Sequence, residues 1–486
     1  MRAREGGMTK TKRVGLILGP ALAAMMLLLG APEGLAFPAW ATGALMVWMA
    51  IWWATEPIPI PVTSLLPLIV LPLVGAASPA KVGSGYAHHI VLLLLGGFVV
   101  AIGIERWGLH KRIALNIVSR VGTSPRALIF GFMVATALLS MWISNTATTL
   151  MMVPIALSAA ASLHDKSGRF VVALLLGVCY AASIGGVATP IGTPTNLIAM
   201  DWLQRETGTS ISFPQWMAFG LPTVLLLIPA AWWAVSKDVT DLGDAGAALK
   251  DVREERAALG RMTVPERRIA AVFAVIAVLW VSRLWTVDLL ASLGWTTLSQ
   301  YSGAQVDMMI AIFGAVLVCA VPAGGDESQA LLRWEEAVRL PWGVLLLFGG
   351  GIALGNAVKD TGLSEWIGAN LDVLSALPAI LFVAVVVSVV IFLTELTSNV
   401  ATMTTLAPIL GALAVGVGVA PASLLAPAAV AASCAFMLPV ATAPNAIIYA
   451  TDEVTVSQMI RHGLRVNLVG IVVITVIGFW LAPLVL

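Results

Sequence analysis

Apolar runs of seventeen or more residues recur along the whole chain, and they limit its fold more than any other feature. Hydrophobic residues make up 59% of the 486 residues and charged residues only 11%, a balance that excludes a soluble globular domain. In lipid every backbone N–H and C=O needs a partner within the protein, so only helices or a closed barrel can span a membrane. Because the runs are continuous rather than alternating, they predict an all-α polytopic membrane protein.

Four features of the first half recur in the second half in the same order, at separations of 253, 254, 254 and 249 residues. They are LLLLGG and LLLFGG, ending at Gly97 and Gly350; Trp107-Gly108-Leu109 and Thr361-Gly362-Leu363; SNTATTLMMVPI and SNVATMTTLAPI, starting at Ser144 and Ser398; and TPIGTPTN and PVATAPN, ending at Asn196 and Asn445. We therefore predict two structural repeats, at residues 38–235 and 269–486. Residues 1–37 are predicted to be an N-terminal cytoplasmic segment with the first helix, and residues 236–268 a charged, solvated cytoplasmic linker.

The distribution of basic residues predicts that the two repeats have opposite orientations in the membrane. Five Lys and Arg residues lie between Arg106 and Arg126, whereas Lys359 is the only one from residue 340 to residue 460. Basic connections stay on the cytoplasmic side, so the equivalent connections should face opposite sides. The first apolar run, residues 14–30, follows Lys10, Lys12 and Arg13 and is interpreted as a retained anchor. We predict a cytoplasmic N-terminus and an outside C-terminus in an inner or plasma membrane.

Helix-breaking residues occur at corresponding places in the two repeats. Pro190, Gly192 and Pro194 precede Asn196, and Pro439 and Pro444 precede Asn445. Backbone groups freed from helical hydrogen bonds inside a membrane are tolerated only beside protein or a water-filled cavity. Paired broken helices therefore indicate a transport site, where helix N-termini face an anion and free carbonyls coordinate a cation.

The Ser-Asn-Thr and Ser-Asn-Val triplets at Ser144 and Ser398 lie between short apolar flanks, which predicts two re-entrant helical hairpins with the triplets at their tips. Ser140 and Thr394 lie four residues before these triplets, one helical turn back on the same face. A small hard cation prefers such oxygens together with backbone carbonyls. Ser, Thr and Asn in membrane helices often join neighbouring helices instead, but the duplication together with the paired breaks favours a binding site.

Other polar residues lead to weaker expectations. Glu395 is interpreted either as a proton carrier or as a partner to backbone amides, and Glu56 and Asp307 are expected at the membrane interface. Three solitary cysteines are expected to fill the core: Cys179, Cys319 and Cys434.

Together these motifs carry a family resemblance. SNTAT at Ser144, TELTSNVAT at residues 394–402, the TPIGTPTN and ATAPN breaks, and WWATEPIPIPVTSLLP at residues 52–67 resemble the divalent anion/sodium symporter family, also called the INDY family. The resemblance covers residues 38–486 and implies a homodimer in membrane lipid, with about eleven transmembrane helices in each protomer. It further implies a scaffold domain and a transport domain that moves as an elevator. The implied substrates are succinate, fumarate, malate, 2-oxoglutarate or citrate, and in some branches sulfate.

The resemblance also assigns site residues. Carboxylate binding falls on Ser144, Asn145, Thr146, Gly192, Thr193, Ser398, Asn399, Thr442 and Ala443. A first sodium site falls on Ser140, Ser144, Asn145 and Gly192, and a second on Thr394, Thr397, Asn399 and Ala441. Many members have Thr where this chain has Val400, a departure that favours an asymmetric or substituted substrate over simple succinate.

No Lys or Arg lies within the motifs to neutralise a dianion. Sodium ions are therefore expected as coupling ions, with no organic cofactor and no nucleic-acid partner. Sodium-independent dicarboxylate exchange, sulfate transport and a non-transporting carboxylate sensor stay open as alternatives. An enzyme is not expected, because the motifs lack a His, Cys or paired-carboxylate group for acid–base or nucleophilic chemistry.

Overall fold

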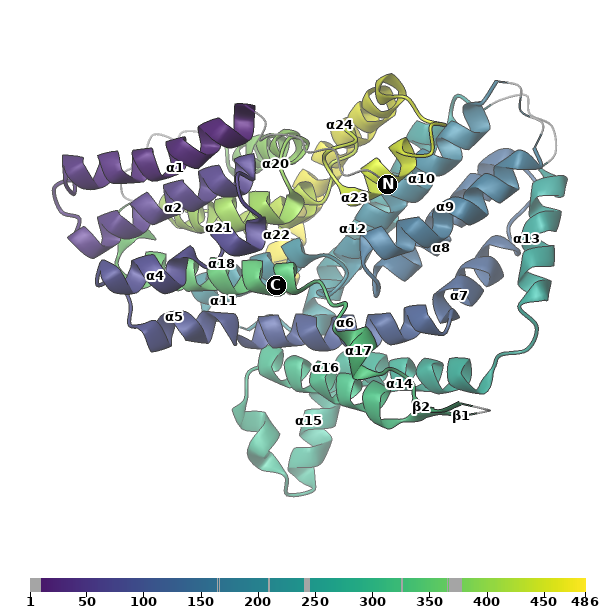
Figure 1. Ribbon diagram of the computed structural model, residues 1–486, viewed down its shortest axis with the longest axis horizontal. Helices are drawn as coiled ribbons and strands as arrows, with labels where there is room; N and C mark the ends of the chain where they lie inside the picture. The colour runs from purple at the N-terminus through teal and green to yellow at the C-terminus, as the bar shows by residue number, and fades with distance from the viewer. Residues whose placement is uncertain are drawn as a thin grey trace.

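The computed structural model describes residues 10–486 except residues 164, 166, 209, 240–244, 325–326, 365 and 367–377. The first nine residues of the predicted N-terminal segment, five residues of the predicted linker and most of the segment after Leu363 thus lie outside the described residues. The described chain is helical apart from one small antiparallel ribbon, β1 (Pro322–Gly324) with β2 (Glu327–Ala330) (Figure 1). This confirms the predicted class, an integral membrane protein made of helices.

The helices follow the order of the two predicted repeats. The first helix is α1 (Lys10–Leu29). The first repeat contains α2 (Phe37–Thr55), α3 (Ile60–Thr63), α4 (Leu66–Leu73), α5 (Pro79–Tyr86), α6 (His89–Arg106), α7 (Leu109–Val118), α8 (Pro125–Ser140), α9 (Asn145–Ala161), α10 (Arg169–Gly185), η1 (Gly186–Ala188), α11 (Pro194–Thr207) and α12 (Phe213–Ser236). The linker forms α13 (Gly246–Ala258). The second repeat contains α14 (Val264–Val281), α15 (Arg283–Ser292), η2 (Thr296–Gln300), α16 (Gly303–Ala320), α17 (Trp334–Ala337), α18 (Trp342–Asp360), α20 (Ala379–Thr394), α21 (Asn399–Val417), α22 (Ala422–Ala432), α23 (Ala443–Tyr449), α24 (Val456–Trp480) and α25 (Ala482–Val485).

The helices that are long and apolar enough to cross a membrane can be counted and compared with the predicted eleven spans. Eight helical segments of the described chain are long and apolar enough to cross a membrane, and α14 with α15, bent by 78°, can form a ninth. The segments are α1, α2, α5 with α6, α10 with η1, α12, α16, α18, and α24 with α25. Length and composition thus give eight or nine spans in the described chain, and the predicted eleven would require shorter apolar segments such as Ile60–Leu73 and Ala422–Ala432 to be counted as well.

Two helical hairpins and two broken helices occur where the sequence predicts them. Helices α8 and α9 have 16 and 17 residues, and α20 and α21 have 16 and 19. At 1.5 Å per residue a helix of 16 residues is about 24 Å long, shorter than a hydrocarbon core of about 30 Å. Helix α10 ends at Gly185 and α11 begins at Pro194, while α22 ends at Ala432 and α23 begins at Ala443.

Close packing between helices depends on small residues at their contacts. A Cβ added to Gly96 of α6 would lie 2.5 Å from the backbone of Ala311 in α16, so these two helices touch through their backbones. Helix α1 packs on α2, where the Trp52 indole donates to the Gly15 carbonyl at 3.1 Å. Helix α10 is the most enclosed span, with 94% of its apolar window buried.

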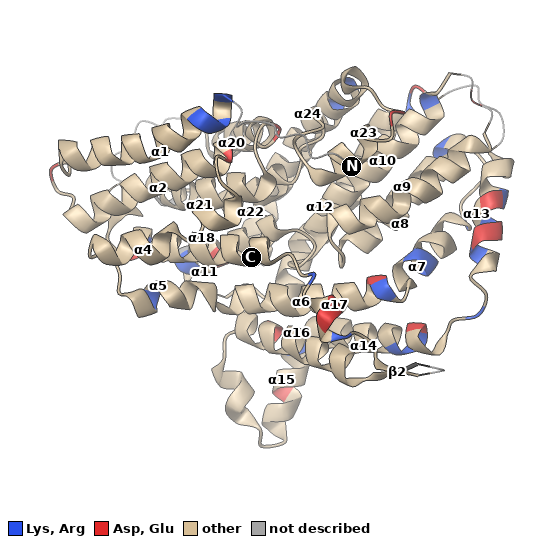
Figure 2. Ribbon diagram, viewed as in Figure 1, with Lys and Arg blue, Asp and Glu red and all other residues tan. Residues whose placement is uncertain are grey.

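Charged side chains gather on α7, α13 and α14 and at the start of α1 (Figure 2). The linker helix α13 differs from the expected solvated surface, because its apolar side buries Leu249 and Val252. It is also tied to the first repeat by an ion pair between Lys111 and Glu255 at 2.7 Å. The linker is thus partly packed rather than wholly solvated.

Two expectations about single residues are wrong. Asp307 is not interfacial: its side chain is buried with the residue 2% exposed, and it accepts a hydrogen bond from the backbone N–H of Phe213 at 3.0 Å. Cys319 is exposed on α16 rather than in the core, although Cys179 and Cys434 are buried as predicted.

Candidate functional site

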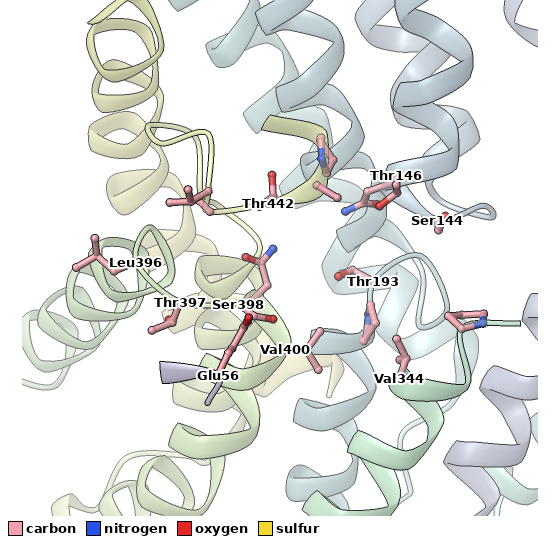
Figure 3. A pocket seen from close by; sticks show the side chains of 18 of the residues that line it. Glu56, Ser144, Thr146, Thr193, Val344, Leu396, Thr397, Ser398, Val400 and Thr442 are labelled. Atoms are coloured by element: carbon pink, nitrogen blue, oxygen red, sulfur yellow. The ribbon is translucent and has the colours of Figure 1, made fainter. Parts of the chain in front are cut away.

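Both hairpin tips and both helix breaks line one open cavity of about 1070 Å³. All nine residues assigned to carboxylate binding lie on its wall. Figure 3 shows Ser144 and Thr146 on one side of the cavity, Thr397 and Ser398 on the other, and Thr193 and Thr442 between them. Residues more than 250 positions apart thus meet in a single site, as the duplicated motifs predict.

The local sequence places four helix N-termini on this cavity: those of three helices of 14 residues or more and that of the seven-residue α23, which begins at Ala443. Ser144 caps α9, where its hydroxyl accepts a hydrogen bond from the Ala147 N–H at 3.2 Å. Helices α9, α11 and α21 begin at Asn145, Pro194 and Asn399, and all three residues line the cavity. Each helix N-terminus carries about half an elementary positive charge. The cavity wall is therefore suited to an anion.

Behind each tip a hydroxyl and an asparagine form the same hydrogen-bonded arrangement. Ser140 Oγ lies 2.7 Å from both Asn145 Oδ1 and the Ala182 carbonyl oxygen. In the second repeat Thr394 Oγ1 lies 2.9 Å from both Asn399 Oδ1 and the Ala432 carbonyl oxygen. Ser140 and Thr394 are fully buried, so they support the tips from behind rather than line the cavity. Each group brings together hydroxyl, amide and carbonyl oxygens, the donor set that a hard cation prefers.

The other residues assigned to the two cation sites do not occupy equivalent positions in the two repeats. In the first break a Cβ added to Gly186 would lie 2.7 Å from Asn145 Oδ1 and 3.0 Å from the Gly192 carbonyl oxygen, so these oxygens converge on the glycine. In the second repeat Ala441 lines the cavity, but the Thr397 hydroxyl is held by the Leu393 carbonyl oxygen at 2.9 Å and by Thr402. The Thr397 hydroxyl is thus bonded within its own hairpin, and the residue that corresponds to Ser144 at the second tip is Ser398.

One buried asparagine holds the backbone of each break. Asn196 Nδ2 donates to the Gly186 and Thr189 carbonyl oxygens at 3.0 and 2.7 Å. Asn445 Nδ2 donates to the Ala435 and Leu438 carbonyl oxygens at 2.9 and 2.8 Å. In both repeats the acceptors lie ten and seven positions before the asparagine. The two asparagines therefore satisfy the carbonyls that each break frees from helical hydrogen bonding.

Glu395 is a partner to backbone amides, which decides between its two expected roles. The residue is 3% exposed, and its carboxylate accepts hydrogen bonds from the N–H groups of Phe436, Met437 and Leu438 at 2.8 to 3.1 Å. Asn467 of α24 donates to the same carboxylate at 2.8 Å. Sequence reasoning missed Asn467, although an asparagine inside a long apolar helix was a usable signal.

Two further residues on the cavity wall were not predicted. Lys12 at the start of α1 and Glu56 at the end of α2 line the cavity, and within the described chain they are its two ionisable lining residues. Glu56 has a left-handed backbone conformation, with φ of 45°, and is labelled beside Ser398 in Figure 3. Glu56 is expected at the membrane interface, and the structure adds that it lies on the cavity wall. No local signal marks Lys12, because the packing of α1 on α2 brings it to the site.

Comparison with known proteins agrees with this geometry. The family model described as the sodium:sulfate symporter transmembrane region matches residues 10–486. A protein named sodium-dependent dicarboxylate transporter SdcS from Staphylococcus saprophyticus is 41% identical over 97% of this chain and 92% of its own length. A protein of the same name from Staphylococcus aureus strain bovine RF122 / ET3-1 is 40% identical over the same shares.

A solved structure shares the fold. The YdaH transporter of Alcanivorax borkumensis superposes with a TM-score of 0.55, covering 92% of this chain and 98% of the YdaH chain at 15% identity. At that identity the likeness concerns the arrangement of helices alone. The match to the family model over nearly the whole chain, together with relatives of 40 to 41% identity, leads to one conclusion. The chain belongs to the divalent anion/sodium symporter family, as its motifs predict.

Proposed function

We propose that this protein is a secondary active transporter that carries a di- or tricarboxylate together with sodium ions. The observation that carries this proposal is the meeting of two duplicated hairpin tips and two duplicated helix breaks in one open cavity. The names of the relatives at 40 to 41% identity, sodium-dependent dicarboxylate transporters, support it. Nothing in this arrangement calls for an enzymatic role.

The two asparagines at the tips are the proposed centres of two carboxylate half-sites. In each one Oδ1 accepts a hydrogen bond from the hydroxyl behind it, from Ser140 to Asn145 and from Thr394 to Asn399. This leaves the Nδ2 group of each asparagine as the donor for an anion. Two half-sites on opposite sides of a cavity suit two separated carboxylates better than the single small sulfate dianion. Thr146 gives the first half-site a hydroxyl that Val400 does not give the second, so the two carboxylates are bound unequally.

Charge balance is the reason for proposing sodium as a co-transported ion. The N-termini of α9, α11 and α21, of about half a charge each, offset roughly three quarters of the charge of a dianion, and the seven-residue α23 adds a weaker fourth contribution. The oxygens at Ser140, Asn145 and Gly192, and those at Thr394, Asn399 and Ala441, are the proposed sodium ligands. Sodium bound there would supply the missing positive charge and would couple the sodium gradient to substrate movement.

Sodium-independent exchange of dicarboxylates is the second candidate, and Lys12 is the observation that favours it. The Lys12 ammonium group on the cavity wall would supply positive charge without any co-transported cation, with the Glu56 carboxylate on the same wall offsetting part of it. The motifs themselves are compatible with both modes. The two modes differ in what drives uptake, which makes them separable by experiment.

We further propose how the parts move and assemble. Both hairpins and both broken helices, with α12 and α24, form a transport domain that moves as an elevator against a scaffold of the other helices. The scaffold would join two protomers into a homodimer in the membrane. The basic stretch at residues 106–126 and the basic residues before α1 place the N-terminus in the cytoplasm and the C-terminus outside.

Uptake of labelled succinate into proteoliposomes tests the proposed function. One set of vesicles has an inward sodium gradient and an empty lumen, and the other has no sodium and unlabelled succinate inside. Uptake in the first set alone supports symport, and uptake in the second set alone makes the protein an exchanger. Citrate and sulfate as competitors define the substrate class. Failure of uptake in both sets, with folded protein in the vesicles, would refute carboxylate transport.

A further inference from the structure

We propose that Arg205 is a positioning residue whose hydrogen bonds to Asn356 and Ile352 hold the first half-site against helix α18; we call these contacts the latch. We further propose that the opposite transport conformation has no equivalent of it. Arg205 lies near the end of α11, the helix that begins at the cavity wall with Thr193 and Pro194. This inference rests on the proposed elevator movement. It concerns the preference between two conformations rather than the identity of the substrate.

Arg205 connects two elements that the proposed movement would separate. Its Nε lies 2.7 Å from Asp201 Oδ2 within α11, and the same guanidinium donates to Asn356 Oδ1 and to the Ile352 carbonyl oxygen of α18. Lys359 of α18 in turn donates to the Arg205 carbonyl oxygen. In Figure 1, α11 lies beside α18, and the contacts between the two helices agree with that view.

Arg205 and Asp201 are buried, whereas Lys359 at the edge of the cluster is exposed, so the hydrogen bonds of the Arg205 guanidinium are the ones that matter energetically. The side chains of Arg205 and Asp201 are 9% and 7% exposed. Hydrogen bonds to charged groups contribute more than neutral ones, and a buried charge left without its partner is costly. Separating α11 from α18 must therefore break hydrogen bonds of Arg205 that are shielded from water.

The sequence of α18 makes room for this contact. A Cβ added to Gly355 would lie 2.8 Å from Trp202 and 3.4 Å from Arg205 Nη1. The Arg205 guanidinium also lies over the Trp202 ring, 5.4 Å from the ring centroid. Close approach of α11 to α18 thus depends on a glycine at the point of contact.

The N-terminal end of α6 adds two histidines to the cluster. His88 Nδ1 lies 3.9 Å from Asp201 Oδ1, and His89 lies beside it with ring centroids 4.0 Å apart. His88 Nδ1 and His89 Nε2 are buried without a hydrogen-bond partner among the described residues. The carboxylate of Asp201 therefore sits between the Arg205 guanidinium and a histidine, and both α6 and α18 surround the end of α11.

The second repeat lacks the residues for the equivalent contact. At the separation of 249 residues found between the breaks, Asp201 and Arg205 correspond to Ala450 and Val454. At the separation of 253 residues found between α6 and α18, Asn356 corresponds to Gly103. Exchange of the two repeat conformations would turn the α11 contact with α18 into a contact of α23 with α6. That contact would have Arg106 in the place of Lys359 and would have Asp452 and Glu453 just after α23, but it would lack the Asp201–Arg205–Asn356 group, so only the conformation seen here carries this latch.

A labelling experiment tests the latch. Leu396 lines the cavity and is 71% exposed, so Leu396→Cys, in a background with the exposed Cys319 changed to Ser, reports which side of the membrane the cavity faces. A membrane-impermeant maleimide is applied to sealed vesicles of both orientations, without substrate. The wild-type latch should give labelling mainly from one side. Asn356→Ala, which removes the partner on α18 and keeps the Asp201–Arg205 pair, should shift the ratio of labelling from the two sides several-fold.

Two further variants and a matched control sharpen the test. The Asp201→Asn/Arg205→Gln double variant leaves no unpaired buried charge and should shift the ratio by about tenfold or more, while Arg205→Lys should shift it less. Arg112→Gln/Glu266→Gln is the control, because this largely buried arginine–carboxylate pair, 2.9 Å apart, joins α7 to α14 within the proposed scaffold. It should keep the wild-type ratio.

The outcomes separate this inference from the proposed function. An unchanged labelling ratio in Asn356→Ala and in the folded double variant overturns the latch, whatever is transported. An equal shift in Arg112→Gln/Glu266→Gln also overturns it, because the effect would then follow from the loss of any buried arginine–carboxylate pair. A specific shift in a protein that fails to take up carboxylates would support the latch and refute the substrate assignment instead.

Discussion

Gly186→Ala is the substitution that tests the proposed first sodium site most directly, because it removes no oxygen. Gly186 has φ of −57° and ψ of −22°, a conformation that alanine adopts readily. The added Cβ would lie 2.7 Å from Asn145 Oδ1 and 3.0 Å from the Gly192 carbonyl oxygen. The Asn145 oxygen cannot turn aside freely, since it is held 2.7 Å from Ser140 Oγ.

The size of the effect follows from these distances. Normal contact requires the asparagine oxygen to move by roughly 0.5 Å, which is about the tolerance of a preorganised binding site. We expect the sodium concentration for half-maximal uptake to rise about 10- to 100-fold, as for other changes that disturb metal ligands from behind. Overpacking should also lower the free energy of unfolding by about 1 to 3 kcal/mol.

The assay is a sodium titration of succinate uptake in proteoliposomes, with sodium-dependent thermal stabilisation in detergent as a readout that needs no transport. Gly97→Ala is the matched control, because its added Cβ would meet Ile191 at 3.6 Å, an ordinary contact. Gly97→Ala should keep the wild-type sodium dependence. Wild-type sodium dependence in Gly186→Ala would refute the argument that the oxygens around Gly186 bind the ion.

Three other predictions follow from the same site. Asn145→Ala and Asn399→Ala should each abolish succinate uptake while the protein stays folded, and unchanged uptake in either would remove that residue from the site. Glu395→Gln should lower the free energy of unfolding by about 1 to 3 kcal/mol, measured by denaturant titration, because its amide NH2 would face backbone N–H groups at Phe436 to Leu438. Asp238, just beyond α12, accepts a hydrogen bond from Arg465 at 3.0 Å, which lowers the pKa of its carboxyl. This hydrogen bond therefore stabilises the fold above the unfolded pKa of about 3.9, and the stabilisation is lost as the pH falls through the lower folded pKa. Asp238→Asn should lower the free energy of unfolding by less than about 1 kcal/mol at pH 7. In a pH series of unfolding curves the effect of the substitution should disappear at the acid end.

The repeats, hairpins and breaks were predictable because each leaves a mark in the local sequence. Apolar runs too short to span, proline and glycine next to asparagine, and a constant separation of about 250 residues are all visible without tertiary structure. Ser140 and Thr394 were also found from helical spacing alone, and both lie behind the tips in the same arrangement. The predictable features are thus those that depend on contacts between residues close in the chain, or between residues related by the duplication.

Residues that reach the site from other helices could not be predicted in this way. Lys12 comes to the cavity because α1 packs along α2, with the Gly15 carbonyl held by Trp52. Asp307 looked interfacial because it lies near the start of an apolar helix, but it is enclosed by α12 and α15. The helical linker hides an apolar side among its charges, with Leu249 and Val252 buried under an outer row of ion pairs.

The two repeats show how a symmetric backbone accommodates unequal side chains. Each break frees amides and carbonyls that must find partners inside the membrane. The first repeat ties its tip to its break through the Thr189 hydroxyl, which donates to the Met141 carbonyl oxygen. The second has Glu395 in place of Met141, and its carboxylate takes three successive amides of the break together with Asn467. Both halves must satisfy these backbone groups, but the groups that do so differ. The contacts of Glu395 lie within the proposed transport domain, whereas the first half-site is also bonded, through Arg205, to Asn356 and Ile352 of α18.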